Sequence, residues 1–309
     1  MRLNFRYMNV HSSKIILLIA LLATSCELIV DVDVPYDGDK VVVNALQQTD
    51  STWYVDLSLT RNIVGPEFYD YISVTNARVT IYNPDGSQEE LTITPPSLAF
   101  RGSSYPQEGQ KYRIRVEPYN MEAVEAEMTM PVAVPIIEVK WDSTEVRQHP
   151  DPYYYNIPFT LKFHDPPGVN NYYAVQVYSS FSYISGYDQD GQPIRDTIAH
   201  VREVALRDDP AIATEEDFKK YFADRTFDGQ TYTAHFDNQF YTSPDQPVIE
   251  IKVTLISMSE ENYKYQETLQ LQGDVDGDPF AQPVQVFSNI SNGFGIFAGN
   301  SVDTRTWKR

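Results

Sequence analysis

Residues 53–60 read Trp-Tyr-Val-Asp-Leu-Ser-Leu-Thr, a stretch in which apolar and polar side chains alternate. The apolar set falls on every second position, at Trp53, Val55, Leu57 and Leu59. Alternation with a period of two is typical of a β-strand that buries one face and exposes the other. The stretch therefore predicts a strand that lies over a hydrophobic core.

The same alternation recurs in the first third of the chain, at 41–43, 77–81, 91–93, 112–116 and 124–130. The segment Asn83-Pro84-Asp85-Gly86 supplies a turn between two of these runs, because proline presets φ and glycine tolerates positive φ. Six or seven short strands in this span are typical of an immunoglobulin-like sandwich. No helical crossover separates the strands, which argues against a parallel α/β fold. We predict an N-terminal β-sandwich over residues 39–134.

A second β-rich body is predicted over residues 135–309. Pro131 and Pro135 bracket a stiff junction. Alternating runs follow at 137–141, 155–163 and 248–256, and a turn at 165–168 leads into a further run at 172–178. Thr214 with Asp217 resembles a capping box for a helix through Phe222. Ser259 opens a second candidate helix through Leu269, although Tyr263, Tyr265, Leu269 and Leu271 also alternate as they would in a strand. The predicted fold is mainly β, with two immunoglobulin-like or fibronectin-type-III-like sandwich domains in tandem. The second domain carries one or two short inserted helices.

Charge and cysteine content exclude two broad classes of protein. The 309 residues include 24 Lys and Arg against 43 Asp and Glu, for a net charge of −19. Nucleic acid is bound by clustered basic residues, so this balance argues against a nucleic-acid partner. The chain has one cysteine, which cannot form a disulfide within its own chain.

The first 26 residues predict a lipoprotein signal. Arg2, Arg6 and Lys14 precede an apolar run at 15–23, and Ala23 and Ser25 lead to Cys26. The run has the length of a signal-peptide core and is too short to span a bilayer. Residues 1–25 are predicted to be a signal peptide and 26–38 an anchor and tether, with lipid on the thiol of Cys26. The alternative is a buried cysteine in an ordinary first helix.

Several segments together resemble a known family. They are Val41-Val42-Val43, Asn76–Tyr82, Gly109–Arg113, Met130-Pro131 with Val134-Pro135-Ile136, and above all Val286–Phe297. They resemble the lipoproteins of domain-of-unknown-function family 4249, over essentially the whole mature chain. The resemblance implies an outer-membrane lipoprotein of a Bacteroidetes-type bacterium, associated with a TonB-dependent β-barrel transporter. It implies no catalytic or binding residue.

Two motifs match known ligand sites in part. Gly293-Phe294-Gly295-Ile296-Phe297-Ala298 matches a dinucleotide fingerprint, but too little chain follows for the helix and acidic residue that the motif needs. We interpret its glycines as relieving crowding in a turn between the final strands. Asp274, Asp276 and Asp278 stand at alternate positions, as Ca²⁺ ligands do. Counted from Asp274, however, the glycine and the twelfth residue of this segment do not match the sixth-position glycine and twelfth-position glutamate of an EF-hand loop. We favour a solvated acidic turn at these three residues. Asp188 with Asp190 is a second and weaker candidate for a Ca²⁺ site.

Aromatic residues suggest a recognition surface. The hairpin at Phe181, Tyr183 and Tyr187 mixes tyrosine, serine and glycine in a predicted protrusion. Exposed rings anchor partners at low entropic cost, although aromatic residues in strands are commonly core residues. These three residues are the predicted binding site.

The sequence shows no hydrolase elbow, phosphate loop or zinc motif, so we predict a protein that is not an enzyme and has no cofactor besides the lipid on Cys26. The leading hypothesis is an outer-membrane accessory subunit of a TonB-dependent nutrient-uptake system. It would lie on the cell surface of the outer membrane, and the alternative location is the periplasmic face. The alternatives are an autonomous glycan- or peptide-binding module and a structural or adhesive surface protein.

Overall fold

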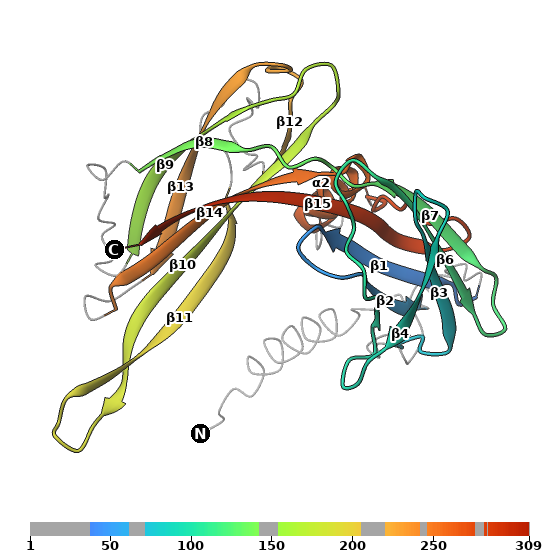
Figure 1. Cartoon of the computed structure of the whole chain (residues 1–309), viewed down its shortest axis with the longest axis horizontal. Helices are drawn as coiled ribbons and strands as arrows, with labels where there is room; N and C mark the ends of the chain where they lie inside the picture. Colours follow the sequence, from blue (N-terminus) through green and yellow to red (C-terminus); the bar gives the residue numbers. More distant parts are fainter. Residues whose placement is uncertain are drawn as a thin grey trace, which may run out of the picture. The chain divides into compact units, whose positions relative to one another are not determined.

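The computed structural model describes residues 38–61, 72–141, 154–204, 220–241, 246–275, 281–282 and 284–308. These residues form a mainly β structure with one helix (Figure 1). The strands are β1 Val41–Gln48, β2 Tyr54–Leu59, β3 Ala77–Tyr82, β4 Gln88–Ile93, β5 Phe100–Arg101, β6 Lys111–Pro118, β7 Val124–Thr129, β8 Ile136–Trp141, β9 Tyr154–His164, β10 Tyr172–Tyr187, β11 Pro193–Val204, β12 Tyr221–Ala223, β13 Thr231–Tyr241, β14 Val248–Met258 and β15 Phe294–Lys308. The helix is α2 Glu260–Val275.

Two sheets contain the described strands. The larger has the order β11-β10-β14-β15-β1-β2-β5-β4-β3-β6-β7, with β12 added to β10, and the smaller has the order β13-β9-β8. Neighbours pair antiparallel except β1 and β15, which run parallel from Val42 opposite Phe294 to Gln48 opposite Asn300. The long red strand in Figure 1 is β15, which lies beside the blue β1.

The first core forms where β1 to β7 direct their alternate apolar side chains inward. Trp53 is fully buried, and its ring meets the ring of Tyr112 edge-on with centroids 4.9 Å apart. The predicted alternation is confirmed from Trp53 to Leu57, because Val55 and Leu57 are buried as well. Beyond it, Leu59 is half-buried against the same core and Ser58 is buried rather than exposed. Ile290 and Phe297, from the far end of the sequence, belong to the same core.

The second core lies between the small sheet and the part of the large sheet made by β10 and β14. Phe159, Leu161 and Phe163 come from β9, and Val253 and Leu255 from β14. All five are buried. The alternation at 159–163 and 251–255 therefore gives strands with one face in this core, as the sequence predicts.

Strand β15 contributes a side chain to the first core and pairs with a strand that lines the second. Its first half pairs with β1 and places Phe297 in the first core, and its second half pairs with β14 as far as Lys308 opposite Glu250. The partition into residues 39–134 and 135–309 stays a prediction. The segment 290–300 packs with the first of those ranges although it belongs to the second by sequence.

Hydrogen bonds hold the proline junction against β14 and β15. Val134 N donates to Ser257 Oγ at 3.1 Å, and Ser301 Oγ donates to the carbonyl of Pro131 at 2.6 Å. Ile136 N donates to Asp303 Oδ2 at 2.7 Å. Buried polar groups of this kind are stable only when they are paired, so the junction is fixed by specific partners as well as by its prolines.

One predicted helix is confirmed and the other is partly wrong. Helix α2 begins directly after Ser259, whose hydroxyl accepts a hydrogen bond from Asn262 N at 3.3 Å, the geometry of an N-cap. For the helix predicted from Thr214, residues 214–219 lie outside the described chain, and Tyr221 and Phe222 belong to β12 instead. Phe222 pairs with Tyr173 of β10 and is buried in the second core, so burial and strand pairing outweigh the local helical signal.

Candidate functional site

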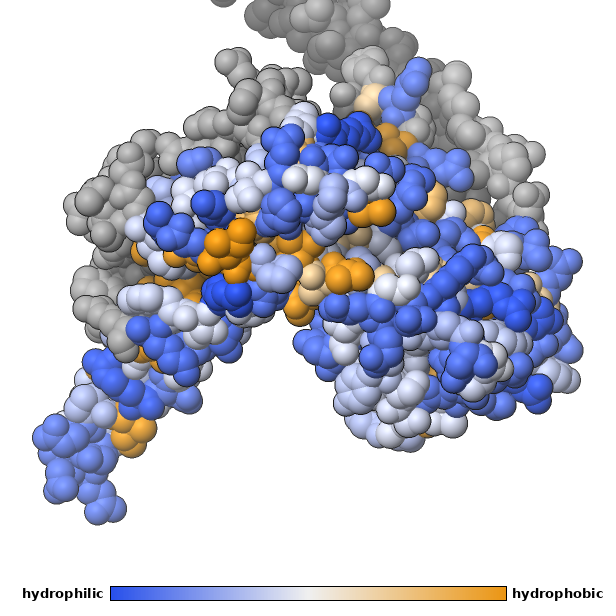
Figure 2. Space-filling model, turned by 45° about the horizontal axis from the view of Figure 1, so that its top comes forward, coloured by the Kyte–Doolittle hydropathy of each residue, from blue (hydrophilic) through white to orange (hydrophobic). Residues whose placement is uncertain are grey.

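The predicted aromatic site lies on the hairpin of β10 and β11. Pairing of β10 with β14 ends at Phe181 opposite Val248, while pairing with β11 continues to Tyr187 opposite Pro193. The hairpin thus extends past the rest of the sheet as a two-stranded ribbon. In Figure 2 its far end, at the lower left, is mainly hydrophilic with a small apolar patch.

The three predicted binding residues differ in exposure. Tyr187 is 67 % exposed and Tyr183 is half-buried. Phe181 is 1 % exposed, and its ring packs edge-on against His200 with centroids 5.5 Å apart. The prediction that Phe181 offers a contact surface is therefore wrong. At this residue β10 is still paired with β14, so Phe181 does not lie in the part of the hairpin that extends past the sheet. Tyr183 and Tyr187 remain candidates.

The turn of this hairpin accounts for Asp188 and Asp190. Asp188 Oδ1 accepts hydrogen bonds from Asp190 N at 3.0 Å and Gln192 N at 2.7 Å. Gly191 has a φ of +77°, which a residue without a Cβ adopts readily. The carboxylate of Asp188 thus stabilises the turn.

Other predicted sites fall partly outside the described chain. Cys26, Asp276 and Asp278 lie outside it. Asp274 is exposed in the last turn of α2 rather than in a loop.

The glycine motif has a packing role in β15. A Cβ on Gly295 would lie 2.1 Å from the carbonyl oxygen of Val43, and a Cβ on Gly299 would lie 2.2 Å from Met130 Sδ. Gly293 lies in the bend before β15, where a Cβ would lie 2.7 Å from the carbonyl oxygen of Val41, as predicted. Gly295 relieves crowding inside the strand, so the prediction that places it in a turn is wrong, because the crowding comes from β1. Gly299, which lies outside the motif, is crowded by Met130 in the same strand.

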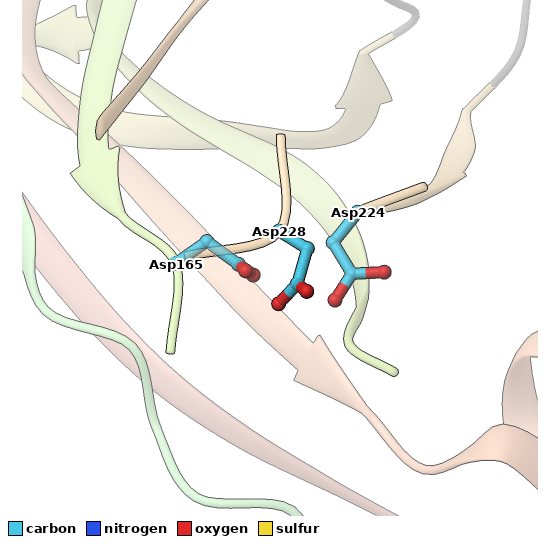
Figure 3. A group of neighbouring side chains, drawn as sticks. All are labelled: Asp165, Asp224 and Asp228. Carbon is cyan, nitrogen blue, oxygen red and sulfur yellow. The ribbon is translucent and has the colours of Figure 1, made fainter. Parts of the chain in front are cut away.

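Three aspartates form a cluster that sequence reasoning missed. Asp165 follows β9, and Asp224 and Asp228 follow β12; one carboxylate oxygen of each lies within 4.8 Å of the others (Figure 3). Asp165 and Asp224 are buried, and Asp228 is exposed. The segment Asp165-Pro166-Pro167-Gly168 signals only a turn, and nothing local in the sequence links it to a loop after β12.

Hydrogen bonds engage each carboxylate of the cluster. Asp165 accepts from the hydroxyl of Tyr173 at 2.5 Å and from Gly229 N at 3.0 Å. Asp224 accepts from Asn171 N at 2.8 Å, and Asp228 from Gly168 N at 2.8 Å. The cluster therefore ties the loop after β9 to the loop after β12. Carboxylate oxygens so close together are also the ligands that a hard cation such as Ca²⁺ prefers.

Burial changes the acid–base behaviour of the cluster. Burial is the largest effect on Asp165 and raises its pKa. The hydrogen bonds from Tyr173 and Gly229 lower the pKa, and the negative charges of Asp224 and Asp228 raise it, so that the net pKa is above the ordinary value. Burial, followed by the hydrogen bond to Asp165, raises the pKa of Tyr173. The site is thus a buried acidic group held beside a neutral phenol.

We expect Asp165→Asn to change how stability depends on pH. Because the folded state binds the proton on Asp165 more tightly than the unfolded state, this residue loses stabilising effect as pH rises from its ordinary pKa of about 3.9 to its raised value. Asparagine does not ionise, so the variant should gain free energy of unfolding relative to the wild type across that interval. Urea unfolding at a series of pH values measures the difference.

Tyr173→Phe provides the matched comparison. It removes one donor to Asp165, so the pKa of Asp165 should rise further and the loss of stability should extend to higher pH. A difference between the wild type and Asp165→Asn that is constant with pH would contradict the account of this cluster.

Comparison with known proteins identifies a family and finds weak likeness to a solved structure. The model of the family described as "Domain of unknown function (DUF4249)" matches residues 28–306. No curated protein matches the chain. Among solved structures, "Biofilm associated protein - B domain" is similar at 5 % identity with a TM-score of 0.19, covering 87 % of this chain and 85 % of the other.

Proposed function

Because the chain belongs to the DUF4249 family, we propose that it is a lipid-anchored outer-membrane protein that assists a TonB-dependent transporter in nutrient uptake and catalyses no reaction. The observation that carries this proposal is the order of basic residues, apolar run and Cys26 ahead of a strongly acidic chain. A multiply acylated cysteine holds a protein far more firmly than a single chain does. Residues 26–38 would then connect the lipid to β1.

Each core would correspond to one immunoglobulin-like or fibronectin-type-III-like sandwich. The second would present the ribbon of β10 and β11 to the transporter. Tyr187 lies at the far end of this ribbon, and its large aromatic side chain is 67 % exposed. A rigid amphipathic ring is the kind of residue that dominates the energy of an interface.

No helix among the described residues is both long and apolar enough to cross a membrane.

Affinity purification from gently solubilised native membranes tests the partner. The full lipidated chain should recover a large β-barrel transporter, and Tyr187→Ala should recover less of it. Asp50→Ala, an exposed change in the turn between β1 and β2, serves as the matched control. Reproducible recovery of the chain alone, with the anchor intact, would contradict the transporter role.

The anchor has a test of its own. Cys26→Ala should move the protein from the membrane fraction to the soluble fraction and abolish incorporation of labelled palmitate, because no other cysteine can accept the lipid. Cys26→Ser tests the same point with a residue of nearly equal size. Unchanged labelling in either variant would refute the anchor.

The exposure of Tyr187 also favours a second candidate, an autonomous glycan- or peptide-binding module. Aromatic rings stack on apolar faces of ligands. Binding of the purified full chain to a glycan array, reduced by Tyr183→Ala or Tyr187→Ala and independent of any transporter, would favour this candidate over the first.

A further inference from the structure

The bend that leads into β15 contains a chemically reactive pair of residues. Asn292-Gly293 is the one place in the sequence where glycine follows asparagine. The backbone nitrogen of the residue after an asparagine can attack the side-chain amide, and glycine permits this attack most easily because it has no Cβ. Asparagine is for this reason counted among the thermolabile residues.

The structure leaves both reacting groups free. Asn292 is exposed and has a left-handed φ of +60°, a conformation that asparagine adopts more readily than most residues. Within the described part of the chain, neither the side-chain amide of Asn292 nor the backbone N–H of Gly293 takes part in a hydrogen bond. No such bond has to break before the two groups react, and solvent water reaches them.

Two other asparagines near β15 are protected by their hydrogen bonds. The amide of Asn289 is engaged at both ends, because Nδ2 donates to the carbonyl of Phe297 at 2.8 Å and Oδ1 accepts from Phe297 N at 3.0 Å. Asn300 lies inside β15, and its Oδ1 accepts from Asn262 Nδ2 at 2.6 Å. Attack on either amide would require these bonds to break.

Asn120 shows that exposure and a left-handed backbone are not sufficient. It is exposed and has a φ of +58°. The next residue, however, is Met121, whose N–H donates to the carbonyl of Pro118 at 3.5 Å. Asn292 therefore differs from Asn120 in the residue that follows it and in the freedom of that residue's N–H.

We propose that Asn292 is a site of spontaneous deamidation. The nitrogen of Gly293 bonds to Cγ of Asn292, the bond from Cγ to Nδ2 breaks, and Nδ2 leaves as ammonia with the proton of the Gly293 N–H. Water then opens the resulting cyclic imide. Attack of water on the main-chain carbonyl of Asn292 leaves Gly293 joined through Cγ, which is isoaspartate, whereas attack on Cγ gives aspartate.

Isoaspartate would weaken the start of β15, because it lengthens the main chain by one carbon at a place that is held on both sides. Before the site, Ser291 N donates to the carbonyl of Glu125 in β7 at 2.9 Å. After it, Phe294 pairs with Val42 of β1. At Gly293 the backbone is so crowded that a Cβ would lie 2.7 Å from a carbonyl oxygen of β1. The extra carbon therefore displaces Ser291 from β7 or Phe294 from β1.

Peptide mapping tests the modification. The purified full chain is incubated in mildly alkaline buffer, which favours loss of the attacking N–H proton, and is then digested with trypsin. The peptide Tyr265–Arg305 contains Asn289, Asn292 and Asn300, so the three are compared in one molecule. The mass gain of deamidation should be confined to Asn292, with isoaspartate the more abundant product. An unchanged Asn292, or equal conversion at Asn300, overturns the proposal.

Urea unfolding tests the consequence for β15, with Asn292→Gly as the matched variant. Glycine accepts the positive φ and has no amide to lose. After incubation the wild type should unfold at a lower urea concentration than before, while the midpoint of Asn292→Gly should not shift. Asn292→Asp, which adds the charge without the extra carbon, should unfold close to the fresh wild type. A wild type that carries isoaspartate and unfolds as the fresh protein does would contradict the weakening. Neither test depends on the lipid or on a transporter.

Discussion

Replacing Gly295 with alanine should prevent stable folding. The Cβ would lie 2.1 Å from the carbonyl oxygen of Val43 and 2.9 Å from its carbonyl carbon and nitrogen, and the φ of +101° is one that alanine rarely adopts. Backbone atoms cannot move aside as a flexible side chain can, so β1 and β15 would have to separate. We expect a loss of more than about 4 kcal/mol, a large part of the stability of an ordinary protein.

Gly273→Ala is the matched control. Gly273 lies in α2 without a positive φ, and a methyl group added to it would meet no atom within 4 Å. Alanine in a helix is more stable than glycine by about 0.5–1 kcal/mol, so this variant should be slightly stabilised. Urea unfolding followed by tryptophan fluorescence measures both. A Gly295→Ala protein that is as stable as the wild type would show that β1 and β15 do not pair as described.

Phe297→Ala should produce the second large loss. Phe297 is fully buried in the first core, with its ring centroid 6.3 Å from that of Trp53. Removing a buried phenyl ring costs about 3–5 kcal/mol through lost burial and the cavity that it leaves. Because the residue comes from the last strand, the loss would show that the first core is incomplete without the C-terminal segment.

Phe294→Ala separates this effect from a general effect of removing a ring. Phe294 is in the same strand but is 44 % exposed. Its replacement should change the free energy of unfolding by only about 0.5 kcal/mol. Equal losses at the two positions would contradict the burial pattern of β15.

The strands could be predicted from sequence because their signal is local. At 53–57 and 251–255, each residue shows by its own polarity which face it takes, and burial confirms the pattern. Helix α2 is predictable for the same reason, since Ser259 caps it. The extension of the helical signal to Phe222 is misleading because this residue gains more by packing in the second core than by extending a helix.

Contacts between distant segments could not be predicted. The parallel pairing of β1 with β15 leaves no pattern in either strand, so Gly295 resembles a turn residue in sequence although it faces Val43. Phe181 has the same local context as Tyr183, and only the end of the pairing with β14 explains why one is buried. The cluster of Asp165, Asp224 and Asp228 joins two loops that no sequence periodicity connects.

Mass spectrometry of the native protein tests the membrane anchor, on which the proposed function depends. We predict a mature chain that begins at Cys26, with fatty acyl groups on its amino terminus and thiol. An unmodified amino terminus, or residues upstream of Cys26 still attached, would contradict the anchor and with it the proposed association with an outer-membrane transporter.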